Sequence, residues 1–283
     1  MAKPKAKLTE DEVGKLSPAE MRAVIRRKEW TEPDEMACLG YWKANMAIVP
    51  KDWAYEFLLY AQRNPQPCWV GAATDPGDPC PRQIASKDAD IRTDLPRYRV
   101  FKDGKLVDEP TDIIKYWRDD LVAFFIGAFP NTAWLFQGAN VRYRLLGAYT
   151  STIPLVPAGR FHGNMAVSAS IFKTTLDVVR AVQISSRYPD GHGAPVHIGG
   201  PETIGVKDLH HADIIPLLPV KNLQHPEMAN KGYDLEPGEV MMWWGCGVTP
   251  QLAAIAARVP FMITHWPAHL FISDKRCEEW SIL

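Results

Sequence analysis

The stretch "GEVMMWWGCGVTPQLAAIAARVPFMITHWPAHLFISD", residues 238–274, decides the fold class of this chain. An apolar run of Val, Met and Trp ends at a Gly-Cys-Gly turn, which is typical of a buried strand that stops at a tight connection. Thr249 and Pro250 then provide an N-cap and a first helical residue, and a second apolar run follows the helix. This order of strand, turn, helix and strand predicts an α/β fold.

The rest of the chain continues the alternation. Caps and apolar spacing predict further helices at residues 8–30, 50–64, 111–127 and 173–188. In the last of these we expect Leu176, Val179 and Val182 to face inward. Strands are expected at residues 68–74, in a hairpin around Asp103-Gly104, and as two or three strands within residues 141–170. The β-rich middle predicts a second, smaller subdomain.

The composition excludes several classes of function. The 283 residues are 46% hydrophobic and 23% charged, and the formal net charge of -1 offers no basic field to nucleic acid or an anionic membrane. No apolar run reaches the roughly 18 residues of a membrane span, and the first residues lack the apolar segment of a secretory signal. Five cysteines without a CxxC pair argue against disulfides or a cysteine-rich zinc site. We therefore expect a cytoplasmic protein that acts on a small molecule without a cofactor.

Cys246 lies in the turn before the expected helix, between two glycines. Free N–H groups at a helix N-terminus attract anions, and they would lower the pKa of a thiol placed there. Cys246 is therefore a candidate catalytic residue, with Gly247 and Thr249 as candidate substrate-binding residues. The alternative is a small buried side chain that fills space between the glycines.

A second turn-rich stretch, "SSRYPDGHGAPVHIGG" at residues 185–200, carries His192 and His197 on a backbone of glycine and proline. Imidazole titrates near neutral pH, so both are candidate catalytic residues for proton transfer. A surface turn with incidental rings is the alternative. His265 ends an expected strand and is a candidate substrate-binding residue. The histidines show no recognised zinc spacing, so no metal is expected.

The charged stretch "DIRTDLPRYR", residues 90–99, alternates Asp and Arg. Arginine forks bind carboxylates through two parallel hydrogen bonds, so this stretch is a candidate clamp for an anionic substrate. In that interpretation Asp94 is catalytic, and Arg92 and Arg97 bind substrate. The alternative is a surface strand whose charges neutralise one another.

Blocks spread over residues 38–275 match a known bacterial family. They include "QRNPQPCWV", "DIRTDLPRYRVFKDG", "WRDDLVAFFIG", "AVQISSRYPDGHGAPVHIG" and "PFMITHWPAHLFISD". On these residues the chain resembles the hydro-lyase family that is similar to the catalytic region of D-glutamate cyclase. The resemblance implies a three-layer α/β domain with a smaller two-layer α/β insert, and chemistry in which water is lost or added. We accordingly expect residues 1–30 to form a helical extension, residues 31–115 and 190–283 the main domain, and residues 116–189 the smaller subdomain.

Five blocks depart from the family pattern together. The usual Cys-Ser-Phe-Ser-Phe-Glu is replaced by "AFPNTAW" at residues 128–134, and the usual Pro-Met-Tyr-Arg-Thr-Asn by "LGAYTST" at residues 146–152. The lost glutamate and arginine suggest a less charged or partly cationic substrate, other than D-glutamate itself. The aromatic side chains that could wall such a pocket are Trp134, Tyr143, Tyr149, Trp243, Trp244 and Trp266, and Asn164 is a further candidate substrate-binding residue. The alternative places the aromatic rings among them in the core.

Three hypotheses of function follow. The first is a metal-independent hydro-lyase or cyclase-like hydrolase that acts on a small polar molecule, expected as a homo-oligomer, in the simplest case a dimer. The second is a non-catalytic small-molecule binder, since a binder can lose catalytic groups and keep its pocket. The third is a metal-dependent hydrolase of small amides or lactams, built from the histidines.

Overall fold

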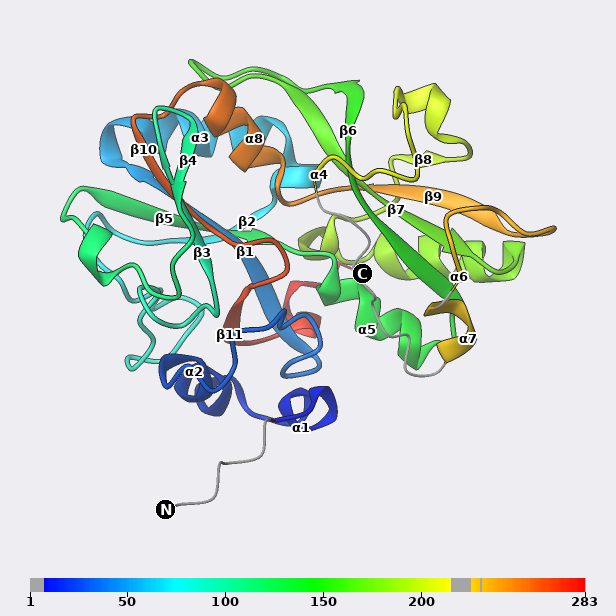
Figure 1. The fold of residues 1–283 in the computed structure, drawn as a ribbon, viewed down its shortest axis with the longest axis horizontal. Helices are drawn as coiled ribbons and strands as arrows, with labels where there is room; N and C mark the ends of the chain where they lie inside the picture. The colour runs from blue at the N-terminus through cyan, green and yellow to red at the C-terminus, as the bar shows by residue number, and fades with distance from the viewer. Residues whose placement is uncertain (1–7, 215–224, 230, 283) are drawn as a thin grey trace.

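The computed structural model describes residues 8–214, 225–229 and 231–282, and it contains two β-sheets with helices packed on them (Figure 1). The helices are α1 (Glu10–Gly14), α2 (Pro18–Arg26), α3 (Lys51–Arg63), α4 (Pro65–Cys68), α5 (Pro130–Gly138), α6 (Thr175–Ser185), α7 (Pro226–Ala229) and α8 (Thr249–Ala256). The strands are β1 (Tyr41–Pro50), β2 (Val70–Ala73), β3 (Tyr98–Lys102), β4 (Lys105–Asp108), β5 (Leu121–Gly127), β6 (Tyr143–Pro154), β7 (Asn164–Phe172), β8 (His197–Ile198), β9 (Val240–Gly245), β10 (Phe261–His265) and β11 (Phe271–Arg276). Short 3-10 turns are η1 (Ile114–Tyr116), η2 (Pro189–Gly191), η3 (Pro201–Ile204) and η4 (Cys277–Trp280).

The larger sheet, called sheet A, is built around β1. Its order is β2-β5-β1-β10-β3-β4, and β11 also pairs with β1. One edge of β1 pairs with β5 along most of its length, while β11 and β10 share the other edge. Every pairing in the sheet is antiparallel. Because β1 has neighbours on both edges and buried side chains on both faces, it is the central strand of the molecule.

Each face of sheet A is covered by a different part of the chain. Helices α3 and α8 pack on one face, where Phe57 and Ala254 meet Phe124 and Met262. The opposite face is covered by the long connection between β2 and β3, which contributes Ile84, Ile91 and Leu95 among others. Sheet A is therefore the middle layer between helices and an irregular but well-packed segment.

The smaller sheet, called sheet B, has the order β6-β7-β9-β8 and is also antiparallel. Helices α5 and α6 cover one face, and Figure 1 shows them beside β7 and β9 on the right of the molecule. Segment 201–212 covers the other face, with Ile204 and Val206 buried against the strands. Sheet B thus forms a second α/β unit beside sheet A.

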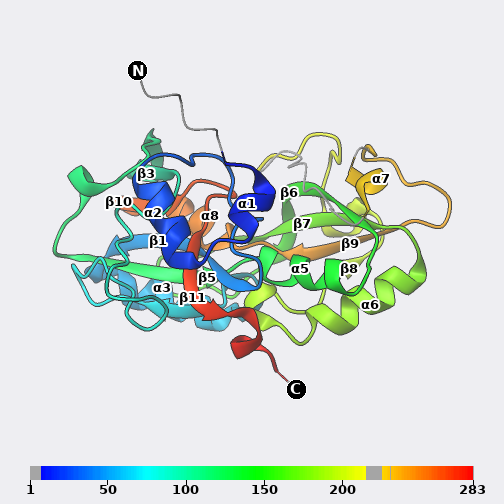
Figure 2. The same ribbon diagram turned by 90° about the horizontal axis from the view of Figure 1, so that it is seen from below.

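The N-terminal helices lie against the outer end of sheet A, as the view in Figure 2 shows. Thr9 and Ser17 each begin a helix with a capping box, because their side chains and a glutamate three residues later satisfy each other's N–H groups. The apolar side of α2, including Met21 and Ile25, packs against Ile272 of β11. Local capping signals and tertiary burial therefore agree in this region.

Much of the sequence interpretation is confirmed. The α/β class holds, and the predicted N-terminal helices, the helix after Pro50, the strand near residue 70, the hairpin at Asp103-Gly104, the two middle strands and the helix after Lys173 are all present. Two details of the helices differ. Val248 rather than Thr249 is the N-cap of α8, and α6 exposes Leu176 and Val179 while burying Asp177, Ala181 and Ser185.

Two predictions of secondary structure are wrong. Residues 111–127 do not form a helix; they contain the short turn η1 and then β5, which is buried at every position. A strand buried on both faces lacks the alternation that marks a half-exposed strand, so its apolar run can resemble a helix. In addition, the strand, helix and strand expected within residues 238–274 would form a βαβ-like unit, but β9 and β10, which flank α8, belong to different sheets.

The strand pairings show which parts of the chain contribute to each of the two sheets. Strand β5, from within residues 116–189, belongs to sheet A, whereas β8 and β9, from within residues 190–283, belong to sheet B. The chain therefore crosses between the two sheets more than once, and the boundaries named above stay a prediction.

Gly127 ends β5 at a point where the backbone of the 188–192 turn comes very close. A Cβ atom added to Gly127 would lie 2.0 Å from the carbonyl oxygen of Asp190. Gly127→Ala is therefore expected to lower the free energy of unfolding by about 1–3 kcal/mol, measured by urea denaturation, because backbone must move. Gly138→Ala is the matched control, since its Cβ would meet nothing within 4 Å. It should be neutral or stabilise helix α5 by about 0.5–1 kcal/mol, and equal losses in both variants would contradict the assignment.

Candidate functional site

A cavity of about 70 Å³ lies where the two sheets meet. Sheet A contributes β1 and the end of β10, sheet B contributes β6 and β7, and five connections between elements close the remaining sides. The side chains with polar atoms or a thiol in the lining are Glu35, Asn45, Ser168, His192, Cys246 and His265. They come from six separate parts of the sequence, so only the packing of one sheet on the other brings them together.

The turn between β9 and α8 forms one wall of the cavity. Cys246 donates its backbone N–H to the carbonyl of Ala166 on β7, and Thr249 Oγ1 donates to the carbonyl of Cys246 at 2.7 Å. Gly247 packs directly on Asn45, since an added Cβ would lie 1.9 Å from Asn45 Nδ2. The turn is thus fixed to both sheets, and only glycine fits at its centre.

The thiol of Cys246 faces this cavity as a protonated group. Burial raises its pKa to about 11, although the N–H of Val248 at the start of α8 opposes the rise. The sequence-based expectation of a lowered pKa is therefore wrong, because desolvation outweighs the helix N-terminus. At neutral pH Cys246 is a proton donor rather than a thiolate.

Glu35 lies in the connection between α2 and β1 and keeps part of its surface toward the cavity. Desolvation by the surrounding protein raises the pKa of its carboxyl group to about 7. The positive charge of the buried Lys43 opposes this rise without reversing it. A carboxyl group with this pKa is present in both protonation states at neutral pH, which suits a residue that must take and return a proton.

His192 and His265 bring two uncharged imidazoles to the cavity. Burial lowers the pKa of each to about 4. The Nδ1 atom of His192 lies 3.2 Å from the carbonyl oxygen of Gln66, which can only accept, so the proton is on Nδ1 and Nε2 is a free acceptor. His192 adopts a left-handed backbone conformation with φ of 74°. The loop that carries it is held by two hydrogen bonds, in which the indole N–H groups of Trp243 and Trp244 donate to the carbonyls of Gly199 and Gly193.

The cavity lining contains no lysine or arginine among the described residues. Glu35 is therefore the residue of the lining that can carry a charge at neutral pH. Lys43 is not part of the lining, but its positive charge favours the ionised form of Glu35. Such a lining does not favour a ligand with several negative charges.

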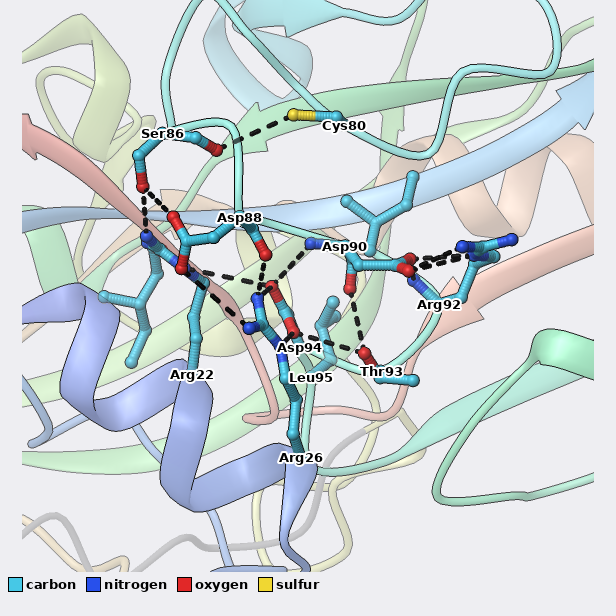
Figure 3. A network of polar contacts seen from close by, with 12 residues as sticks. Arg22, Arg26, Cys80, Ser86, Asp88, Asp90, Arg92, Thr93, Asp94 and Leu95 are labelled. Carbon is cyan, nitrogen blue, oxygen red and sulfur yellow. Dashed lines mark hydrogen bonds and ion pairs between the residues drawn. The ribbon is translucent and has the colours of Figure 1, made fainter.

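The predicted clamp around Asp94 is a structural network instead of part of the cavity. Asp94 is fully buried, and Figure 3 shows it on the 86–95 loop, facing Arg22 and Arg26 of α2. Its carboxylate accepts from Arg26 Nε at 2.5 Å and lies 3.8 Å from Arg22 Nε, while Arg92 pairs with Asp90. The contacts of Asp94 hold helix α2 against the loop that covers sheet A.

Two further candidates also lie away from the cavity. Arg97 stacks over the ring of Trp266, with 5.4 Å between its Cζ and the ring centroid. His197 begins β8 and its Nε2 lies 3.0 Å from the carbonyl of Gly200. Neither residue belongs to the cavity lining.

The aromatic candidates are divided between core and smaller hollows. Trp243 and Trp244 are fully buried in the two faces of sheet B. Trp134 lines an adjoining hollow with Glu35, and Tyr149 and Asn164 line a separate groove on sheet B. Of the substrate-binding candidates, the structure brings only Gly247 and His265 to the cavity, together with the catalytic candidates His192 and Cys246.

The sequence interpretation missed Glu35, Asn45 and Ser168. Glu35 is one acidic residue in a polar stretch, and nothing in its neighbours distinguishes it from a surface carboxylate. Asn45 offered a better signal, since an amide inside an apolar strand must find a partner, here the Gly127 carbonyl at 2.7 Å. Among the described residues, no three His, Cys, Asp or Glu side chains are grouped so that they could hold a metal ion.

A model of the D-glutamate cyclase family matches residues 122–274, which is more than half of the chain. The chain belongs to the D-glutamate cyclase family. Within this family match lie His192, Cys246 and His265, whereas Glu35 and Asn45 precede it. The cavity therefore combines the family region with a segment supplied by the N-terminal part of the chain.

Proteins named "Putative hydro-lyase" are similar to this chain over nearly its full length. The protein from Bacillus licheniformis is 44% identical over 96% of this chain and 99% of its own. Those from Geobacillus kaustophilus and Psychrobacter arcticus are 41% and 39% identical, over 95% and 96% of this chain and 98% and 99% of their own. A solved nitrogen repressor-like protein from Methanococcus jannaschii aligns at a TM-score of 0.37 and 9% identity, covering 92% of this chain and 99% of its own, which is too distant to bear on the site.

None of the helices within the described residues combines the length and the apolar character needed to cross a membrane. The cytoplasmic location and the homo-oligomeric state stay predictions.

Asp190 lies in the same turn as His192, a residue of the cavity lining, and the burial of its carboxyl group can be tested. The side chain is fully buried, neither carboxyl oxygen has a well-formed hydrogen bond within the described residues, and burial raises its pKa to about 7. Between the unfolded pKa of about 3.9 and a folded pKa of about 7 the folded state binds the proton, so this group's contribution to stability falls as pH rises through that range. Above the folded pKa the loss is complete.

Asp190→Asn should therefore lose less stability than the parent when the pH is raised from 5 to 8, as measured by urea denaturation at both values. The comparison of slopes isolates Asp190 from other buried carboxyl groups such as Glu35. An unchanged slope would show that Asp190 is ionised in the folded protein.

Proposed function

We propose that the chain is a lyase-type enzyme that removes or adds water on a small polar molecule other than D-glutamate, and that the cavity between the sheets is its active site. The family membership and the relatives named hydro-lyase support the reaction class. The observation that carries the proposal is the meeting of Glu35 with Cys246 and His192 in one cavity.

The two proton-transfer groups of this cavity have complementary states. Glu35 titrates near neutral pH, so its ionised form can remove a proton from the carbon next to a carbonyl. Cys246 is protonated and can give its proton to the leaving hydroxyl. The C–O bond breaks as the C=C bond forms, water leaves, and the proton on Glu35 restores the thiol; water addition follows the reverse course.

The other polar groups would bind and orient the substrate. His192 Nε2 can accept a hydrogen bond from a substrate hydroxyl, since its proton is held on Nδ1 by Gln66. The described part of the chain offers no hydrogen bond to the hydroxyl of Ser168, which leaves it for a ligand. Neutral donors and acceptors surround a single carboxyl group, and this supports an uncharged or partly cationic substrate.

A screen of hydroxy acids, small amides and lactams, followed by mass spectrometry for the gain or loss of one water, tests this function. Glu35→Gln is expected to lower kcat by about 10²–10⁴-fold, because an amide cannot take the proton. The parent should also lose activity below a pH near 7, where Glu35 becomes protonated.

His197→Ala is the matched control, since this histidine lies outside the cavity, and it should keep the parent's kcat. Full activity of Glu35→Gln would exclude the assigned base. Ligand-dependent thermal stabilisation without turnover of any compound would instead support the non-catalytic binder.

A further inference from the structure

The ring of His265 takes a place in sheet A that a backbone group would normally fill. Strands β1 and β10 pair from Ile48–Ile263 to Ala47–Thr264. At the next position Met46 meets the imidazole of His265, with the backbone nitrogen of Met46 3.1 Å from Nδ1. His265 is 1% exposed and lines the cavity.

The contact with Met46 decides where the imidazole proton lies. A backbone N–H can only donate, so in the contact with the nitrogen of Met46 the Nδ1 atom of His265 accepts and carries no proton. The carbonyl of Met46 also lies 3.3 Å from Nδ1 and would attract a proton there. The nitrogen of Met46 is the closer of the two atoms, at 3.1 Å against 3.3 Å, which favours the accepting state.

Gln251, on helix α8, makes the second contact to the same atom. Its side chain is 5% exposed, and Nε2 lies 2.9 Å from Nδ1 of His265. An amide can present either its oxygen or its nitrogen, but an Nδ1 that already accepts from Met46 selects the nitrogen. Gln251 and Met46 therefore act on His265 in the same direction.

The other ring nitrogen is left unused by the protein. With Nδ1 accepting, the proton of the neutral ring is on Nε2, and this buried atom has no hydrogen-bond partner within the described residues. Burial opposes a second proton on the ring and outweighs the carbonyl of Met46, which favours one, and the nearby His269 and Arg99 act in the same direction as burial. A buried N–H without a partner is costly unless a ligand accepts from it.

We propose that Gln251 is a positioning residue that holds His265 as an uncharged Nε2–H donor for an oxygen atom of the substrate. A carbonyl oxygen fits best, since it gains negative charge when the neighbouring carbon loses its proton, and a neutral donor stabilises that charge without a cation in the cavity. The substrate half of this proposal rests on the proposed function, whereas the state of the ring does not.

The unmodified protein tests the state of the ring directly. Long-range proton–nitrogen NMR on the full chain at pH 7 distinguishes a protonated Nε2 from a protonated Nδ1 and from the doubly protonated ring. We expect His265 to show a protonated Nε2 and a bare Nδ1. A proton on Nδ1, or a doubly protonated ring, would overturn the proposal whether or not the protein is an enzyme.

Gln251→Glu tests the positioning role. A carboxylate beside Nδ1 would draw a proton to that atom and raise the pKa of His265, so the NMR signature should change to a protonated Nδ1. In a turnover assay kcat should fall by about 100-fold, as when one oxyanion-binding donor is lost, with a smaller change in KM. Gln183→Glu, the same change on the exposed side of α6, is the control and should leave both readouts unchanged.

The two readouts separate the possible failures. An unchanged ring state in Gln251→Glu, with the fold intact by circular dichroism, would exclude Gln251 as the positioning residue. A changed ring state without any loss of turnover would show that His265 does not serve the substrate. Complete inactivity of the parent chain toward all compounds, with the expected ring state, would overturn the proposed function and leave the assignment of Gln251 standing.

Discussion

The contact of Gly247 with Asn45 and Gly127 is the constraint on which the rest of the structure depends. A Cβ atom on Gly247 would lie 1.9 Å from Asn45 Nδ2 and 2.9 Å from the Gly127 carbonyl oxygen, so only glycine allows the turn after β9 to reach β1 and β5. Asn45 in turn donates to Gly127 at 2.7 Å. This junction joins sheet B to the centre of sheet A, and the cavity lies beside it.

Burial at the junction sets the chemistry of the cavity. Desolvation moves every titratable group that lines it toward its uncharged form: the pKa of Glu35 rises to about 7, that of Cys246 rises to about 11, and those of the two histidines fall to about 4. Neutral donors and acceptors in a small dry space interact more strongly with developing charge than the same groups in water. The fold therefore produces a site whose polarity comes from hydrogen bonds more than from fixed charges.

Local signals account for the elements that were predicted correctly. Thr9 and Ser17 with their partner glutamates mark two helix starts, and Asp103-Gly104 marks a hairpin, because these features depend on neighbours in sequence. Strands β1 and β5 have buried side chains on both faces, and their apolar runs carry no period that separates strand from helix. Their assignment depended on pairing with distant strands.

By itself the sequence determined the α/β class and the family. It also singled out His192 and Cys246, two of the residues to which roles are proposed, because they lie in turns of glycine and proline whose shape is a local property. The tertiary structure alone decided which polar groups share a cavity. It brought Glu35 to Cys246 and held Asp94 in an ion pair with Arg26, and it raised the pKa of the thiol that the helix N-terminus alone would have lowered. Desolvation is a sum over atoms from many distant segments, so it exists only once the two sheets have packed together.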